Sequence, residues 1–259
     1  MKQALQDLQQ GDTKIVEVPR PVCGPGQVLI STQSSLISGG TEKSLVEFGQ
    51  ANLLTKARSR PDKVRQLLNK LSTDGLLPTM EAVFSRLGEP LPLGYCNAGT
   101  VIEVGDGVTE FSVGDRVVSN GPHAEVVSVP RNLCARIPDG VSDEEAPFTV
   151  LASIALQGVR LAAPSLGDRV AVLGLGLIGL LTVQILKAYS CQVIGTDFDQ
   201  RKLSLAEEFG AEIVNLSKGE DPIQAGLSFS GGKGIDKVII AAATESNDPV
   251  HQAAQMSRK

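Results

Sequence analysis

Short apolar runs separated by turn residues mark the first half of the chain. Apolar and β-branched residues gather at 28–34, 100–104, 116–119 and 124–129. The turn 24–26 precedes the first run, 105–107 closes the second, and Pro130 ends the last. Runs of this length with glycine and proline punctuation predict strands. Closely spaced strands of this kind predict a small, barrel-like all-β domain.

A different pattern interrupts these strands at residues 41–90. The segment 62–71 places Val64, Leu67, Leu68 and Leu71 on one face at helical spacing. Pro61 and Asp62 suit its first turn, and a second helix is expected after Thr79. The simplest interpretation is an inserted helical lobe over one mouth of the barrel. A role in shaping a substrate site or in assembly is the alternative.

From Ser142 onward, strands and helices alternate. Ser142 with acidic residues behind it predicts a helix N-cap, and the helix should run to about residue 163. The strands expected after it are 169–173, 192–197, 212–215 and 237–242, with helices at 178–190 and 200–209. Such alternation predicts a parallel sheet with crossover helices.

A glycine-rich turn lies between the first of these strands and its helix. Gly174, Gly176 and Gly179 match the pattern GxGxxG. The first glycine permits the tight turn, the second allows close approach of a pyrophosphate, and the third lets helix and strand pack closely. The free amides of the helix start, including those of Leu177 and Ile178, favour phosphate. The motif predicts dinucleotide binding, with a glycine turn of another α/β fold as the alternative.

The next strand ends in an acid about 20 positions further on, as the dinucleotide fingerprint requires. Asp197 can accept both ribose hydroxyls of an adenosine, and its charge disfavours a 2′-phosphate, so NAD is preferred to NADP. Arg201 and Lys202 lie close enough to soften that preference. Ala243 and Thr244 follow the strand 237–242 at the carboxyl edge of the sheet, where ligands of such sheets bind.

Composition narrows the class of protein. The net charge of −5 in 259 residues lacks the basic footprint of a nucleic-acid or anionic-membrane partner. No apolar run is long enough for a bilayer, and the N-terminus lacks the apolar core of a signal peptide, so a cytoplasmic location is expected. Four isolated cysteines form no CxxC pair, which fits a reducing compartment.

Taken together, these stretches resemble the medium-chain dehydrogenase/reductase superfamily. The segments 25–30, 94–107 and 113–117 are similar to its glycine-rich N-terminal strands, and 172–179 with Asp197 to its cofactor domain. The resemblance implies a GroES-like β-barrel catalytic domain at 1–150, with the insertion at about 41–90, and a Rossmann NAD-binding domain at 151–259. It implies an oxidoreductase with a small-molecule substrate and leaves a homo-oligomer open.

The departures from this family concern its metal. Members with catalytic zinc carry a cysteine and a histidine where this chain reads Gly39-Gly40-Thr41-Glu42 and Gly94-Tyr95-Cys96. Zinc of that kind needs three protein ligands and an open position. Only Glu42 and Cys96 remain as donors, and neither His123 nor His251 fits the family's positions. The segment between Val117 and Ala124 has no cysteines for a structural zinc. We therefore expect no zinc.

Without a metal, a side chain must move the proton that accompanies hydride transfer. The resemblance places Tyr95, Glu42, Thr41 and Ser38 at the catalytic cleft. Tyr95 can donate or relay a proton, and Glu42 can act as a base, although Tyr95 is equally well a packing aromatic. The amino-acid sequences of these segments are most similar to those of zinc-lacking sugar-pathway oxidoreductases of bacterial polysaccharide synthesis. The bacteriochlorophyllide-dehydrogenase-like branch is also similar.

The end of the sequence departs from the family as well. The resemblance implies two further strands and a returning segment after the last helix, so we expect a Rossmann sheet truncated at its C-terminus, with strand 237–242 as an uncovered edge. Three hypotheses remain open: an NAD-dependent, zinc-independent oxidoreductase acting on a hydroxyl or carbonyl, for example of a sugar derivative; an NADPH-linked quinone or enoyl reductase; and a non-catalytic dinucleotide-binding module.

Overall fold

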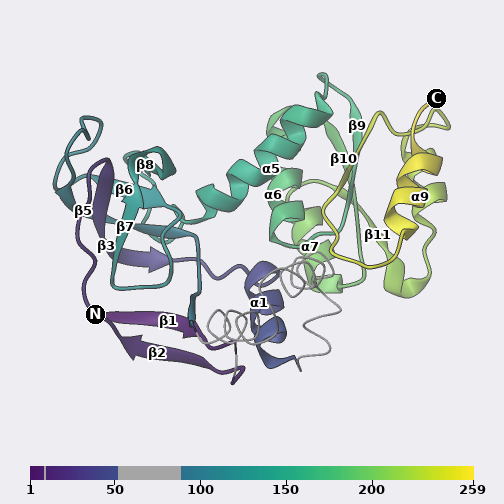
Figure 1. Ribbon diagram of the computed structural model, residues 1–259. Helices are drawn as coiled ribbons and strands as arrows, with labels where there is room; N and C mark the ends of the chain where they lie inside the picture. The colour runs from purple at the N-terminus through teal and green to yellow at the C-terminus, as the bar shows by residue number, and fades with distance from the viewer. Residues whose placement is uncertain (9, 52–88) are drawn as a thin grey trace, which may run out of the picture. The chain divides into compact units, whose positions relative to one another are not determined.

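The computed structural model describes residues 1–8, 10–51 and 89–259, in two compact units, Met1–Phe148 and Thr149–Lys259 (Figure 1). The strands of the first unit are β1 Lys2–Gln6, β2 Thr13–Glu17, β3 Gln27–Ser35, β4 Leu91–Pro92, β5 Asn97–Val104, β6 Arg116–Ser119, β7 Val126–Pro130 and β8 Cys134–Arg136. Its helix α1 spans Thr41–Gln50, and a 3₁₀ turn spans Arg131–Leu133. The helices predicted at 62–71 and after residue 79 lie outside the described residues.

Two antiparallel sheets build the first unit. Five strands pair in the order β7-β3-β5-β6-β8, and three pair in the order β2-β1-β4. An isolated bridge between Gln3 and Ala124 connects the two sheets. Strand β3 is central, with Val28 and Ile30 buried against Val101, Val117 and Val127. The apolar residues at alternate positions of β3 and β5 therefore face one closed core, as expected for a small β-barrel domain.

The sequence predicted β3, β5, β6 and β7 of this unit and missed its other four described strands. Strand β7 begins at Val126 instead of residue 124, because the backbone of residues 124 and 125 pairs with β1. Strands β1, β2, β4 and β8 were not predicted. Strand β2 is almost wholly exposed and β4 has two residues, so neither carries an alternating pattern.

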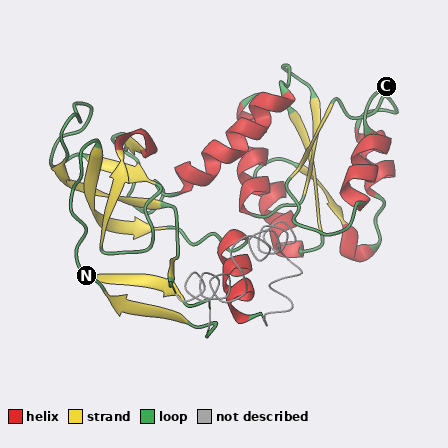
Figure 2. Ribbon diagram, in the orientation of Figure 1, coloured by secondary structure: helices red, strands yellow, loops and turns green. Residues whose placement is uncertain are grey.

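The second unit is a parallel sheet between helices (Figure 2). Its helices are α5 Phe148–Ala162, α6 Leu177–Ala188, α7 Gln200–Glu208, α8 Pro222–Phe229 and α9 Asp248–Met256, with a 3₁₀ turn at Leu216–Lys218. Its strands are β9 Arg169–Leu173, β10 Gln192–Asp197, β11 Glu212–Asn215 and β12 Lys237–Ile240, in the order β11-β10-β9-β12. Every pair is parallel. This is the doubly wound architecture predicted from the alternation.

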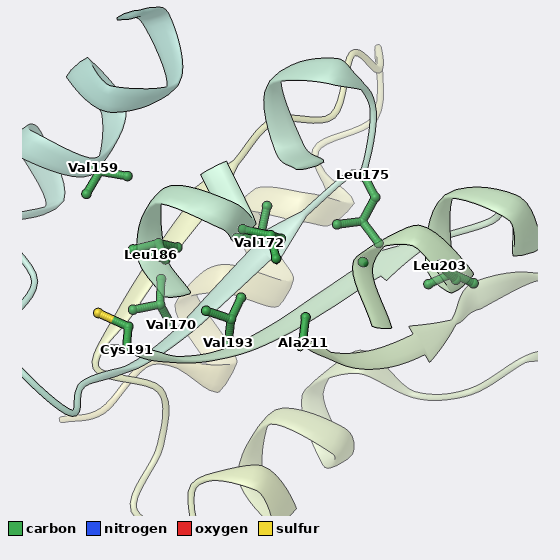
Figure 3. Packing of buried hydrophobic residues seen from close by; sticks show 11 residues of the cluster. Val159, Val170, Val172, Leu175, Leu186, Cys191, Val193, Leu203 and Ala211 are labelled. Atoms are coloured by element: carbon green, nitrogen blue, oxygen red, sulfur yellow. The ribbon is translucent and has the colours of Figure 1, made fainter. Parts of the chain in front are cut away.

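Successive residues of the central strand face opposite layers of helices. Val170 and Val172 point to one side, into a cluster with Val159 of α5, Leu186 of α6 and Leu203 of α7 (Figure 3). Ala171 and Leu173 point to the other side, into a cluster completed by Met256 of α9 and Ala225 of α8. Truncating a buried leucine in such a cluster costs about 2–5 kcal/mol. The burial of β9 on both faces fixes the end of the strand at which the glycine turn begins.

Two boundaries of this unit differ from expectation. The side chains of Ser142 and Glu145 cap each other's amides as predicted, but they close a turn, and α5 begins only at Phe148. Pro147, which lies between Glu145 and Phe148, has no backbone N–H with which to continue a helix. Strand β12 ends at Ile240 instead of residue 242. Over the described ranges, no helix combines the length and apolar character needed to cross a membrane.

Candidate functional site

The glycine turn after β9 leaves no room for side chains at two of its three glycines. Gly174 has a φ of +93°, and a Cβ there would lie 2.7 Å from the backbone N and Cα of Ala242. A Cβ at Gly179 would collide with the carbonyl oxygen of Gly174. Both positions therefore require glycine, the first for conformation and close approach, the second for packing of α6 against the turn.

The middle glycine differs, because a Cβ at Gly176 would meet no atom within 4 Å. Gly176 is the N-cap of α6, and among the described residues no side chain caps that helix. Helices α7 and α8 of the same sheet are capped by Asp199 and Asp221. The start of α6, with Leu177 and Ile178, thus presents free amides beside open space. This is the arrangement that binds phosphate oxygens.

Asp197 ends β10 beside this turn. Its Oδ2 accepts a hydrogen bond of 2.8 Å from the amide of Leu175, and its Oδ1 accepts one of 2.9 Å from the amide of Asp199. Its side chain is 11% exposed. Each carboxylate oxygen can accept a further donor. The carboxylate is therefore fixed at the carboxyl edge of the sheet, next to the glycine turn.

The two basic candidates lie differently around Asp197. Nζ of Lys202 is 3.6 Å from Oδ1 of Asp197. Arg201 instead pairs with Asp199, its Nε 3.5 Å from Oδ1. Hydrogen bonds from the amide and guanidinium of Arg201 hold the pKa of Asp199 below its ordinary value. Ala243 and Thr244 follow β12 in an irregular segment, next to Ala242, which contacts the turn.

A second group of polar side chains lies within the first unit. Glu42 in the first turn of α1 is 5% exposed. Its Oε1 accepts a hydrogen bond of 2.7 Å from the amide of Ser38, and its Oε2 lies 2.9 Å from Nε2 of His123. The other ring nitrogen of His123 lies 2.9 Å from Oγ of Ser35, the last residue of β3. Buried charges are found in proteins where they are paired in this way.

Cys96 and the catalytic candidates Tyr95 and Thr41 take no part in this network of described side chains. Cys96 is fully buried, and burial together with the nearby Glu42 carboxylate raises the pKa of its thiol to about 11. Tyr95 precedes it, half-buried, and has no hydrogen bond to the described residues. Thr41 is exposed at the start of α1. The structure thus brings Glu42, Ser38 and Cys96 together and leaves Thr41 at the surface.

Metal ligands are scarce in this group. Within residues 1–8, 10–51 and 89–259, no cluster of three histidine, cysteine, aspartate or glutamate side chains is arranged to hold a metal ion. Both ring nitrogens of His123 already have partners. The described residues of this group do not fit a three-ligand catalytic zinc site.

His123 and Ser35 were not among the site residues predicted from the sequence. The sequence separates His123 from Glu42 by 81 positions and from Ser35 by 88, and no spacing motif connects residues so far apart. One signal was available: His123 is one of only two histidines and directly precedes a predicted strand.

Comparison with known proteins agrees with this architecture. The model of the alcohol dehydrogenase GroES-like domain matches residues 74–139, and that of the zinc-binding dehydrogenase domain matches residues 178–259. The (R,R)-butanediol dehydrogenase of Bacillus subtilis is 32% identical over 255 residues, which cover 88% of this chain. The chain belongs to the medium-chain dehydrogenase/reductase superfamily. Its two units have the GroES-like and Rossmann folds expected from the sequence.

Other members of the superfamily match in part. The D-guloside 3-dehydrogenase of Escherichia coli is 34% identical over 151 residues, covering 57% of this chain and 43% of that protein. The crystal structure of the 2R,3R-butanediol dehydrogenase from Bacillus subtilis superposes with a TM-score of 0.74 at 25% identity, covering 99% of this chain and 74% of that one. The chain spans 66% of the length of the curated butanediol dehydrogenase and less than half of the guloside dehydrogenase.

Proposed function

We propose that this superfamily member is an NAD-dependent, zinc-independent oxidoreductase that moves a hydride between nicotinamide and a hydroxyl or carbonyl carbon of a small molecule. The proposal assigns catalysis to the unit ending near residue 150 and cofactor binding to the rest. A bound nicotinamide dinucleotide would supply the hydride chemistry. The protein supplies positioning, electrostatics and a path for the proton.

One observation carries the cofactor assignment: the hydrogen bond between the Leu175 amide and Asp197. It fixes the acid of the second strand directly beside the glycine turn of the first. Free amides at the start of α6 and the open space at Gly176 lie on the same turn. We infer that the turn binds the diphosphate and Asp197 the adenosine ribose, with Ala243 and Thr244 lining the edge.

The charge of Asp197 supports NAD over NADP. A largely buried carboxylate at the ribose disfavours a 2′-phosphate by like-charge repulsion. The ammonium of Lys202 at 3.6 Å offsets part of that charge and favours the NADPH-linked alternative. Because Lys202 is itself 42% exposed, solvent screens its contribution, and we assign NAD as the cofactor.

A hydroxyl or carbonyl substrate is supported by the relatives, which are named for oxidation of a diol and a sugar derivative. The poor fit of the described residues to zinc supports metal-independent chemistry. In this proposal Glu42 belongs to the proton-transfer apparatus, and Tyr95 and Thr41 are candidates for contact with the substrate.

Cofactor binding can be measured on the full chain. The chain contains no tryptophan, so the fluorescence of the reduced nicotinamide is observed without protein background from that residue. We expect NADH to bind at least tenfold more tightly than NADPH, a difference of about 1.4 kcal/mol. A folded chain that binds neither nucleotide, or binds NADPH more tightly, would overturn the assignment.

A further inference from the structure

Three side chains from separate parts of the first unit form a continuous hydrogen-bonded chain. Oγ of Ser35 lies 2.9 Å from Nδ1 of His123, and Nε2 of His123 lies 2.9 Å from Oε2 of Glu42. The side chains of His123 and Glu42 are 15% and 7% exposed, whereas Ser35 is half-buried at the end of β3. A hydroxyl, an imidazole and a carboxylate in this order are the elements of a base-activated hydroxyl.

Two features determine the position of the imidazole: the main-chain hydrogen bonds of His123 and the glycine at position 94 beneath the ring. The amide of His123 donates to the carbonyl of Leu93 at 2.7 Å, and its carbonyl accepts from the amide of Ala4 at 2.9 Å. Gly94 lies under the ring with a φ of +89°, and a Cβ there would come within 2.6 Å of three ring atoms. The ring is therefore fixed in the plane that joins Ser35 to Glu42.

These contacts determine which atom donates and which accepts in each hydrogen bond of the Ser35–His123–Glu42 series. A glutamate carboxylate only accepts hydrogen bonds, so Nε2 of His123 carries the proton that points to Glu42. In the neutral imidazole Nδ1 is then an acceptor, and it receives the hydroxyl proton of Ser35. Both oxygens of Glu42 are engaged, by His123 and by the amide of Ser38. Ser35 is consequently the residue at which a new proton can enter this series of hydrogen bonds.

We propose that Ser35 and His123 take up the substrate proton in the reaction assigned above, with Ser35 as the catalytic residue that contacts the substrate hydroxyl. This inference rests on the proposed function. During oxidation the substrate O–H bond breaks and its proton passes to Oγ of Ser35, while the hydroxyl proton of Ser35 passes to Nδ1 of His123. A bound oxidised nicotinamide would accept the hydride, with the electron pair of its C–H bond, from the carbon that carries this hydroxyl.

His123 and Glu42 act through Ser35 and do not themselves contact the substrate in this proposal. The imidazolium formed at His123 is stabilised by the Glu42 carboxylate at 2.9 Å, as the acid of a catalytic triad stabilises its histidine. Proton transfer by such groups contributes about 10²–10⁴-fold to a rate.

A hydroxyl activated in this way also reacts with a sulfonyl fluoride, which gives a test that needs neither cofactor nor substrate. Phenylmethylsulfonyl fluoride is added to the full chain and modified serines are located by mass spectrometry. In the expected reaction the Ser35 oxygen bonds to sulfur, fluoride leaves, and the proton goes to His123. We expect Ser35 to be modified at least tenfold faster than its neighbour Ser34, which has no histidine partner.

Variants separate activation from folding. His123→Asn removes the basic imidazole and should abolish the selective modification of Ser35, whereas His251→Asn at the exposed histidine of α9 should leave it unchanged. Ser35→Ala and His123→Asn should lower alcohol oxidation by about 10²–10⁴-fold while the NADH dissociation constant stays within twofold. Equal labelling of Ser35 and Ser34, or labelling that persists in His123→Asn, would overturn the relay.

The two proposals fail differently in this experiment. A chain that binds NADH and shows no selective reaction at Ser35 keeps the proposed function and loses the relay. A chain whose Ser35 reacts selectively and which binds no nicotinamide nucleotide loses the proposed function and keeps the activated hydroxyl.

Discussion

The amide of Leu175 and Oδ2 of Asp197 are joined by a 2.8 Å hydrogen bond. Leu175 lies inside the glycine turn after β9, and Asp197 is the last residue of β10, so the bond couples the two halves of the dinucleotide fingerprint. Leu175 is also fully buried in the cluster that holds α6 and α7 on the sheet. Core packing, turn conformation and the orientation of the acid therefore depend on one another.

The charge of Asp197 can be removed while its hydrogen bond to Leu175 is kept. Asp197→Asn keeps an oxygen acceptor for the Leu175 amide and removes the negative charge, together with the acceptor for the Asp199 amide. We expect the preference for NADH over NADPH to fall by about tenfold, because the repulsion of a 2′-phosphate is lost. The measurement is a titration of both nucleotides by fluorescence. Lys202→Ala is the matched control and should shift the preference the opposite way, towards NADH. An unchanged preference in both variants contradicts the role of Asp197.

The three glycines of the turn should respond differently to alanine. Gly174→Ala and Gly179→Ala place a Cβ against backbone atoms and should destabilise the Rossmann unit by at least 1–3 kcal/mol. Gly176→Ala meets open space, so its thermal unfolding should match that of the wild type while NADH binding weakens at least tenfold. Circular dichroism and nucleotide fluorescence distinguish the two effects. Loss of stability in Gly176→Ala equal to that of the other two would show that its role is packing.

The regular parts of the Rossmann unit could be predicted from the sequence, because the strands are short runs rich in β-branched residues between turns, and β9 and β10 are largely buried. Strands β9, β10 and β11 begin and end where the pattern predicts. Helix α8 was not predicted, since its eight residues are too short for a clear period. The ring of His123 reaches Glu42 only through the pairing of β1 with residues 123–125, a long-range contact that leaves no local pattern.

Gly94 should determine the position of the His123 ring. Gly94→Ala puts a Cβ within 2.6 Å of three ring atoms and adds strain at a φ of +89°, so the ring must move away from Glu42. The chain has only two histidines, which makes their imidazole signals separable by nuclear magnetic resonance. We expect the His123 signals to shift towards those of a solvent-exposed ring, with His251 unchanged as the internal reference. Unaltered His123 signals would show that the turn at Gly94 adapts instead.

Asp236 should make the Rossmann unit sensitive to acid. It accepts a hydrogen bond of 2.9 Å from the amide of Arg169 and pairs with Arg258 at 3.1 Å. These contacts, the Arg169 amide first, lower the pKa of its carboxyl in the folded state. The stabilisation is therefore present above about pH 4, the ordinary value for aspartate, and is lost as pH falls through the lowered pKa.

Asp236→Asn tests this dependence by urea unfolding at several pH values. We expect a loss of about 1–3 kcal/mol at pH 7, the worth of a hydrogen bond to a charged group, and a smaller difference from the wild type below pH 3. Arg258→Gln removes only the exposed partner and should cost less. A difference that grows as the pH falls would have the wrong sign for a lowered pKa.

Cys96 should resist alkylation in the folded chain and respond to Glu42. Burial first, and then the Glu42 carboxylate, raise the pKa of its thiol to about 11, so little thiolate exists at pH 8 and the side chain is inaccessible. Iodoacetamide should label Cys23 before Cys96, and Cys96 only after unfolding. Glu42→Gln removes the smaller cause, so the thiol pKa should fall by less than the total shift and labelling should rise modestly. Rapid labelling of Cys96 in the wild type would mean that the irregular segment between β4 and β5 opens. Ser35, whose neighbour Leu36 donates to the Cys96 carbonyl at 2.9 Å, would open with it.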